Sequence, residues 1–240
     1  MDNYNDVARH ELINWKKHMK KKPSIIEAYS KEVQNKFNNI LPEKYHEVMT
    51  VAIKNMTKAV LYGSKYVTKP PYEYLTLRER EDLLIDKTLI YKKTAKLEGA
   101  GTGAGGLLLG LADLPILLGI KVKFLYDVAA IYGFDVNDYR ERIYILNIIQ
   151  LAFSSKKHIN EVFNQMENWN EYIKTLPEDI NEFDWRTFQQ QYRDYLDLAK
   201  FFQLMPGIGA FVGFYINGKL IDKLSETAMF AYRMRMKELE

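Results

Sequence analysis

A run of 22 residues, from Gly99 to Ile120, limits the fold of this chain more than any other part of the sequence. It holds seven of the chain's 13 glycines and one charged residue, Asp113. About 20 consecutive apolar residues are enough for a helix to cross a bilayer. Three interpretations therefore compete: a membrane span, a nucleotide-binding loop, and a helix packed between close neighbours.

A lone membrane span is disfavoured because Asp113 and Pro115 interrupt the run. A carboxylate at the bilayer centre costs roughly 2.5–3.5 kcal/mol on insertion scales. The part before the interruption, Gly99–Ala112, would reach only about 21 Å as a helix, whereas the hydrocarbon layer is about 30 Å thick. A short hairpin that dips into one leaflet remains compatible with the sequence.

Two glycine patterns match nucleotide-binding spacings without the context that those motifs need. Gly101–Gly106 fits G-x-G-x-x-G, but the dinucleotide fingerprint follows a β-strand, and the preceding residues here are charged and helical in pattern. Gly213–Leu220 fits G-x-x-x-x-G-K, but Leu220 stands where a P-loop needs Ser or Thr to bind Mg²⁺. We therefore predict no phosphate-binding loop and no nucleotide cofactor.

A helix with two glycine faces explains the run better. Each glycine in a helix costs about 1 kcal/mol relative to alanine, so the pattern needs a compensating contact. At 100° per residue the glycines divide between opposite faces, and such faces let neighbouring backbones approach closely. We predict a central glycine-rich helical hairpin that acts in packing or ligand binding, with Gly209–Gly213 as a second small face. Its residues are Gly99, Gly101, Gly103, Gly105, Gly106, Gly110, Asp113 and Pro115.

Asp113 has two interpretations. It directly precedes Leu114-Pro115, where an Asp N-cap and a proline in the first turn are both favoured. It is also the only charge in an apolar stretch, so it must be capped, paired, hydrogen-bonded or protonated. A buried functional carboxylate, facing a ligand or a partner, is the second interpretation.

Helical periodicity extends along almost the whole chain. Apolar residues recur at spacings of three and four from the N-terminus onward, and no period-2 strand or hairpin dipeptide interrupts them. Thr76 and Glu79 form a capping-box signature, Asn137 or Asp138 can cap a later helix, and Gly133 fits the left-handed position after a last turn. We predict an all-α fold in which residues 1–240 form a single bundle-like domain.

Composition removes several classes of function. The chain has no cysteine, which excludes disulfides, thiolate zinc sites and cysteine nucleophiles. Its four histidines lack the spacing of a zinc-binding helix, so we predict no metal site. The net charge of +3 does not indicate nucleic-acid binding. The first residues, MDNYNDVARHE, contain no apolar signal-peptide region, so we expect a cytoplasmic location.

A basic cluster near the N-terminus offers a contact surface. Lysines beside an interfacial tryptophan favour an anionic membrane, because each lysine near such a surface contributes about 1 kcal/mol. A solvated helix face is the alternative. The candidate contact residues for a membrane or a partner are Trp15, Lys16, Lys17, Lys20, Lys21 and Lys22.

The segment LEGAGTGAGGLLLGLADLPILLGIKVKFLYDVAAIYGFD resembles the signature of the EcsC family. That signature has a glycine-rich run, then Asp-x-Pro (Asp113 and Pro115), an apolar helix with a basic residue (Lys121 or Lys123), and an ending like Tyr132–Asp135. The segments that begin at KPSIIEAYS and at PGIGAFVGFY are similar to that family as well. The resemblance implies a bacterial protein, often encoded beside the ATPase and membrane subunits of an ABC-type exporter. It carries over no catalytic residue.

These observations together predict a non-enzymatic accessory or adaptor protein. It would be cytoplasmic, peripherally associated with the membrane, and in contact with ABC-transporter subunits or an anionic membrane surface. One alternative is a helical module that binds a lipid or small molecule, with Asp113 near the floor of a cavity. Another is a hydrolase that uses Asp113 with other acids, although no catalytic constellation is visible.

Overall fold

The computed structural model shows a chain of helices. It describes residues 3–21, 51, 54, 57, 58, 60, 69–103, 114–154, 156–182, 184 and 210–239. The α-helices are α1 (Asn3–Met19), α4 (Leu77–Gly103), α6 (Leu114–Ile131), α7 (Tyr139–Phe153), α8 (Lys156–Glu167), α9 (Trp169–Tyr172) and α12 (Ala210–Arg233). Short 3-10 helices span Ile173–Thr175, Ile180–Glu182 and Lys237–Leu239. No β-strand occurs within these ranges, and the predicted all-α class is confirmed.

The glycine-rich segment is described in part. α4 continues without a break through Gly99 and Gly101 to Gly103, so the first of these glycines are helical, as predicted. α6 begins one residue before Pro115, which lies in the first turn, where a helix tolerates proline. Three glycines and one acid lie outside the described residues: Gly105, Gly106, Gly110 and Asp113. The glycine hairpin and both interpretations of Asp113 therefore stay predictions.

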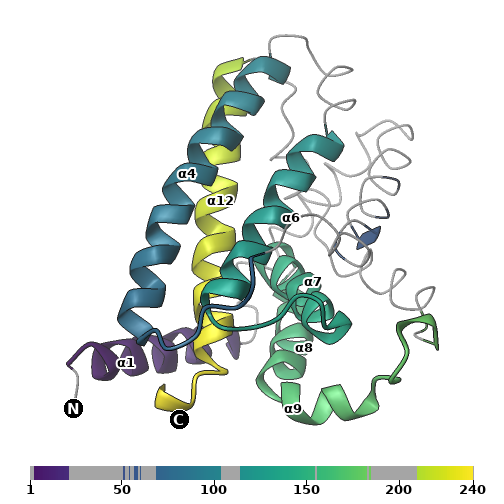
Figure 1. The fold of residues 1–240 in the computed structure, drawn as a ribbon. Coiled ribbons are helices and arrows are strands. Elements are labelled where there is room, and N and C mark those ends of the chain that lie inside the picture. The colour runs from purple at the N-terminus through teal and green to yellow at the C-terminus, as the bar shows by residue number, and fades with distance from the viewer. Residues whose placement is uncertain are drawn as a thin grey trace.

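α4 and α12 form the longest feature of the molecule. They lie side by side and antiparallel, with α6 next to them, while α1 crosses below their lower ends (Figure 1). Contacts between α4 and α12 occur along their length, because Glu81 meets Arg233 near one end and Lys96 meets Gly218 near the other. No helix in the described ranges is both long enough and apolar enough to span a membrane.

α7 is the central helix of the lower part of the molecule. Every one of its residues except Arg140 is buried. α8 and α12 pack against it, and α6 contacts it as well. A helix that buries all its faces must be surrounded by other elements, so α7 organises the core on which the lower ends of α6 and α12 rest.

The helix boundaries follow local signals in the sequence. Thr76 and Glu79 form the predicted capping box: the Thr76 N–H donates to Glu79 Oε2 at 2.8 Å, and the Glu79 N–H donates to Thr76 Oγ1 at 3.3 Å. Asp138 caps α7 by accepting the Arg140 N–H at 2.9 Å. Gly133 follows α6 with φ +89°, so its predicted left-handed conformation is confirmed.

We expect two glycine-to-alanine changes to alter stability in opposite directions. Gly133→Ala should lower the free energy of unfolding by about 1–2 kcal/mol, because its backbone is left-handed and an added Cβ would lie 3.3 Å from Arg80 Nη1. Gly119→Ala, within α6 and with no atom within 4 Å of the added Cβ, should raise it by up to about 1 kcal/mol. Chemical denaturation of both variants measures this, and a loss at Gly119 as large as that at Gly133 would contradict the explanation.

Candidate functional site

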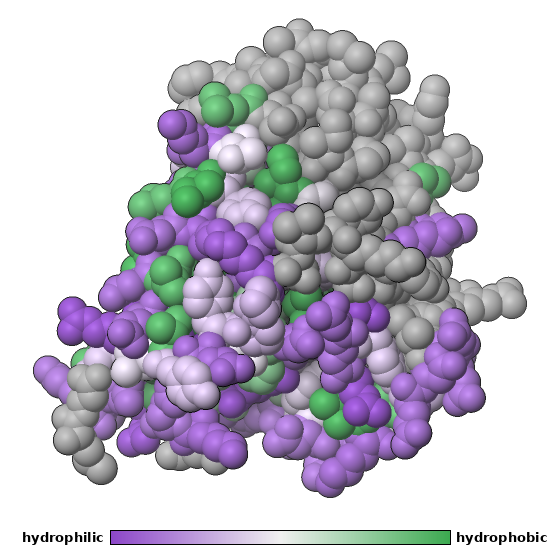
Figure 2. Space-filling view, in the orientation of Figure 1, coloured by the Kyte–Doolittle hydropathy of each residue, from purple (hydrophilic) through white to green (hydrophobic). Residues whose placement is uncertain are grey.

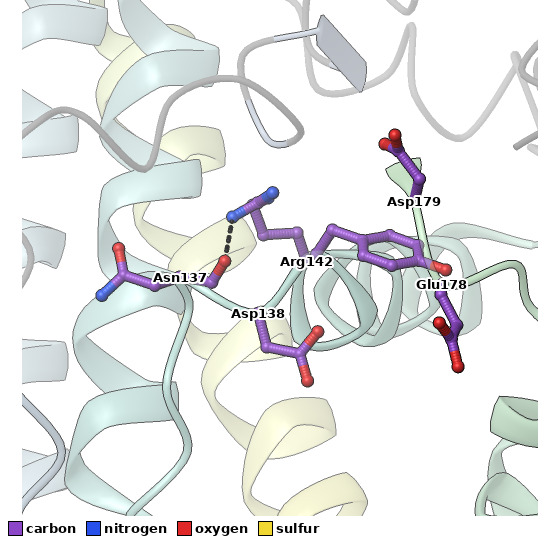
Figure 3. A pocket seen from close by; sticks show the side chains of 6 residues that line it. Asn137, Asp138, Arg142, Glu178 and Asp179 are labelled. Atoms are coloured by element: carbon purple, nitrogen blue, oxygen red, sulfur yellow. Dashed lines mark hydrogen bonds between the residues drawn. The ribbon is translucent and has the colours of Figure 1, made fainter. Parts of the chain in front are cut away.

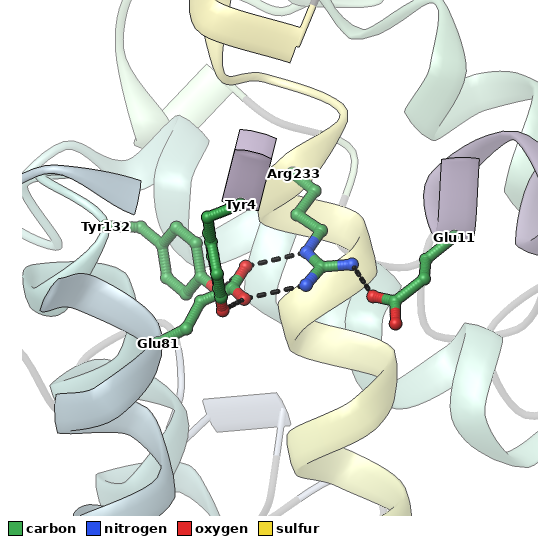
Figure 4. Close-up of polar contacts among 5 residues, drawn as sticks. All are labelled: Tyr4, Glu11, Glu81, Tyr132 and Arg233. Carbon is green, nitrogen blue, oxygen red and sulfur yellow. Dashed lines mark hydrogen bonds and ion pairs between the residues drawn. The ribbon is translucent and has the colours of Figure 1, made fainter. Parts of the chain in front are cut away.

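A buried ion pair joins α12 to α4 near the base of the molecule. Arg233 Nε donates to Glu81 Oε1 at 2.6 Å, and Arg233 Nη2 donates to Glu81 Oε2 at 2.7 Å. Each of the two side chains is only 4% exposed. The third guanidinium nitrogen, Nη1, donates to Glu11 Oε2 of α1 at 2.7 Å. One arginine therefore ties three helices together (Figure 4).

Two tyrosines complete the shell around Glu81. The Tyr4 hydroxyl donates to Glu81 Oε2, and the Tyr132 hydroxyl donates to Glu81 Oε1 at 3.4 Å. Burial, together with the neighbouring Glu81 carboxylate, raises the pKa of Tyr4 to about 12. Both carboxylate oxygens of Glu81 thus accept two hydrogen bonds each, and neither is directed at an open space. The arrangement suits a structural clamp better than a proton-transfer site.

A second ion pair joins Glu141 of α7 to Arg235, just after the end of α12. Both oxygens of its carboxylate also accept hydrogen bonds. Arg235 Nη1 donates to Glu141 Oε2 at 2.7 Å, while the Tyr232 hydroxyl donates to Glu141 Oε1 at 2.7 Å. The Arg235 guanidinium lies over aromatic rings, 3.7 Å from the Phe134 centroid and 4.3 Å from that of Tyr144. The partners of both charges come from this chain, so the pair holds α7 against the end of α12.

A pocket of about 490 Å³ lies beside the start of α7 (Figure 3). Its lining residues are Asn137, Asp138, Tyr139, Arg142, Glu178 and Asp179. Asp138 is used as the cap of α7, and Asp179 accepts the Asn181 N–H at 2.8 Å. Arg142 Nη1 donates to the carbonyls of Val136 and Asn137 at 2.8 and 2.9 Å. These bonds shape the loops of the pocket, and no nucleophile–base pair is formed among its lining residues.

Three of the six predicted contact residues near the N-terminus make contacts within the chain. Trp15 stacks on Phe230 of α12 at 5.1 Å between ring centroids and meets Phe163 of α8 edge-on at 5.6 Å. Lys16 and Lys20 both pair with Glu167, at 3.3 and 2.8 Å. Two further lysines of the cluster, Lys17 and Lys21, are exposed, and Lys22 lies outside the described residues.

The far end of the α4–α12 pair combines basic and apolar side chains. We call this the distal end: Lys92–Gly103 of α4, Ala210–Lys223 of α12, and the first turns of α6, all at the top of Figure 1. Its α4 and α12 parts hold five lysines and two acidic residues, Glu98 and Asp222. Asp222 is already paired with Lys92 at 2.6 Å. The distal end is therefore basic.

Exposed apolar groups accompany the lysines of the distal end. Leu97 and Tyr215 are both exposed, and the Lys219 ammonium lies 5.7 Å from the centroid of the Tyr215 ring. Lys219 and Lys223 are exposed on α12. The sequence analysis missed this surface, because its lysines are far apart in the chain. The signal was the unequal distribution of charge along α4, because four of the five acids in Leu77–Gly103 precede Leu89 and three lysines follow Ile90.

Two polar clusters hold α6 against the other long helices. Lys121 of α6 donates to Asn217 Oδ1 of α12 at 3.2 Å, and burial lowers the pKa of this lysine to about 8. Asp127 accepts from Lys123 at 2.6 Å, Lys87 at 3.1 Å and Tyr91 at 2.9 Å. Although burial opposes the shift, these donors lower the pKa of Asp127. No group of three His, Asp or Glu side chains suited to a metal ion occurs in the described ranges.

We expect Arg233→Met to lower the free energy of unfolding by about 3–5 kcal/mol, because it leaves the Glu81 carboxylate buried without a countercharge. Glu11→Gln is the matched control: its side chain is 52% exposed, so the loss should be at most about 1 kcal/mol. Adding Glu81→Gln to Arg233→Met should recover part of the loss, since it removes the unpaired charge. Urea denaturation of the three variants tests this, and equal losses for Arg233→Met and Glu11→Gln would exclude the clamp.

Comparison with known proteins gives consistent matches. A model of the EcsC protein family matches residues 6–236. The chain is 44% identical over 233 residues to Protein EcsC of Bacillus subtilis (strain 168), which covers 97% of this chain and 96% of that protein. It is 30% identical over 143 residues to the uncharacterized protein YdbA of the same strain, covering 59% of this chain and 52% of that protein. No solved structure matches the chain.

Proposed function

The chain belongs to the EcsC protein family, and from this premise we propose that it is a non-enzymatic accessory or adaptor of an ABC-transporter system. In this proposal it acts from the cytoplasm, at the membrane face, as a peripheral protein. The resemblance described above associates the family with ABC-type exporters. The distal end supplies the surface for the membrane.

The distal end carries the membrane part of the proposal. Exposed lysines attract anionic headgroups, and exposed apolar side chains such as Leu97 and Tyr215 can enter the interface between headgroups and acyl chains. Tyrosine is suited to that depth, because its ring is apolar and its hydroxyl is polar. Lys219 stands over the Tyr215 ring and places its charge beside this residue.

The connecting sequences support the same orientation. α4 ends, and α6 and α12 begin, on one side of the molecule (Figure 1). The sequence that joins α4 to α6 is AGGLLLGLAD, and the one that precedes α12 includes FFQLMPGIG. Both are rich in apolar residues and both attach at the distal end. From the ends of this basic surface the chain thus continues into apolar sequence, which favours an anionic bilayer as the partner of this end.

The polar interior is better suited to an adaptor than to an enzyme. Glu81 and Glu141 are buried carboxylates that accept hydrogen bonds on both oxygens from side chains of the same chain. Catalytic acids and bases need a position open to a substrate. The hydrogen bonds that these two carboxylates accept instead hold helices together, as expected for a protein that presents surfaces to partners.

We expect the protein to sediment with vesicles containing anionic phospholipid, to bind neutral vesicles poorly, and to dissociate at high salt, because screening weakens contacts with charged headgroups. Changing Lys96, Lys219 and Lys223 together to Gln should weaken binding by roughly two orders of magnitude, at about 1 kcal/mol per lysine. The matched control changes Lys16, Lys17 and Lys21 to Gln and should bind nearly as well as the wild type.

Two outcomes would contradict membrane binding through the distal end. If the wild type does not sediment with anionic vesicles, membrane binding is wrong. If the α1 control loses binding and the distal variant keeps it, the membrane surface is the lysine cluster of α1 and not the distal end.

The adaptor part of the proposal calls for a partner assay. We expect a photo-crosslinking residue at Tyr215, introduced in the native host, to capture an ATPase or membrane subunit of an ABC transporter, because this exposed side chain lies on the surface proposed to face the membrane. A crosslinker at Glu178, exposed in the loop between Ile173–Thr175 and Ile180–Glu182, is the control position. Mass spectrometry identifies the captured proteins. If the crosslinker at Tyr215 captures no ABC subunit above the level found with the Glu178 control, this function is excluded.

A further inference from the structure

The outer face of α4 is open along its middle. Ile85, Leu89 and Ile90 are 58%, 61% and 60% exposed. Figure 2 shows hydrophobic patches, separated by hydrophilic ones, along the side of the molecule that α4 forms. Single exposed aliphatic residues are ordinary on protein surfaces, but three within two turns of one helix face form a patch. We call Ile85, Asp86, Leu89, Ile90 and Lys93 the α4 face.

The charges of the α4 face are arranged symmetrically about its apolar centre. Asp86 and Lys93 are both exposed, and neither forms a side-chain hydrogen bond or ion pair with any residue in the described ranges. They are seven residues apart, so they lie almost on one line along the helix at 100° per residue. Leu89 and Ile90 lie about 50° to either side of this line, midway between the charges.

We propose that the α4 face binds the same face of a second copy of this chain, with the two α4 helices antiparallel. A two-fold axis midway between Leu89 and Ile90 places Asp86 opposite Lys93 of the second copy, and Lys93 opposite its Asp86. Leu89 then meets Ile90 of the second copy on both sides of the axis. A two-fold interface requires a self-complementary surface, and the α4 face meets this requirement in charge and in apolar contact.

The charge pattern favours a second copy in one orientation. In a parallel pair Asp86 would face Asp86 and Lys93 would face Lys93, and like charges repel. An anionic membrane would be repelled by Asp82 and Asp86, which are exposed in the first half of α4. Only the antiparallel pair satisfies both charges of the α4 face.

The contact would be small and concentration-dependent. It involves about three turns of one helix from each copy, which is the size range of weak or transient interfaces. Antiparallel pairing directs the two distal ends away from each other, so both could not face one flat membrane. The dimer is therefore a form of the protein in solution, and its existence does not depend on the membrane binding proposed above.

Sedimentation equilibrium over a concentration series tests the dimer. The wild type should move from the 28.2 kDa chain mass toward twice that mass as the concentration rises. Asp86→Lys alone and Lys93→Asp alone should each raise the dissociation constant at least roughly tenfold, because each change turns two attractions into two repulsions. An equal mixture of these two variants should associate again, since every facing pair then has opposite charges. The double variant Asp86→Lys, Lys93→Asp should associate like the wild type for the same reason.

Controls separate this result from folding and from membrane binding. Lys174→Asp reverses an exposed charge elsewhere and should leave association unchanged. At concentrations where the wild type is a monomer, all variants should keep its melting temperature, because the altered side chains are exposed. A wild type that stays at the chain mass throughout, reversals without effect, or a mixture that stays monomeric would each overturn the proposal. The lysine variants used for vesicle binding leave Asp86 and Lys93 intact, so the two proposals fail independently.

Discussion

The buried ion pair between Arg233 and Glu81 is the interaction on which the arrangement of the long helices depends. Taking two charges out of water costs several kcal/mol for each ion, and the mutual attraction offsets this only when the geometry is good and every remaining donor and acceptor is satisfied. Here the bidentate contact supplies the geometry, and Tyr4, Tyr132 and Glu11 satisfy the remaining groups. The contacts therefore bring α1, α4, α12 and the residue after α6 to one point (Figure 4).

Further polar pairs between α4 and α12 follow the Arg233–Glu81 pair along their interface. Above the ion pair, Thr88 Oγ1 lies 2.7 Å from Ser225 Oγ, and Lys92 pairs with Asp222 at 2.6 Å. A shift of one helix by a single residue would separate all of these partners at once. Purely apolar contacts tolerate such shifts better, because the hydrophobic effect has no direction. Polar pairs at successive levels thus specify how far α12 lies along α4, and with it which residues reach the distal end.

Local sequence signals predicted the helix boundaries better than they predicted these long-range contacts. The capping box at Thr76 and the left-handed Gly133 depend on residues within a few positions, so the sequence alone was sufficient. Glu81 carries a signal that went unused: it stands between Leu77 and Leu84 on the buried side of α4, where a carboxylate requires a partner. Nothing in the sequence near Glu81 indicates that this partner is Arg233. Trp15 carries a local signal that fits two roles, because a tryptophan beside lysines suits both a membrane anchor and a helix contact. In the structure it packs between Phe163 and Phe230.

Gly218 of α12 lets Lys96 of α4 lie directly against the backbone of α12. A Cβ at Gly218 would lie 2.4 Å from Lys96 Cε, so the aliphatic part of Lys96 crosses α12 where that helix has no side chain. A lysine can cover apolar surface with its chain while its ammonium stays in a polar environment. Gly218 thereby lets α4 and α12 stay close at a level where they would otherwise be separated by a side chain. The close packing of the two helices at this level therefore depends on the absence of a side chain at Gly218.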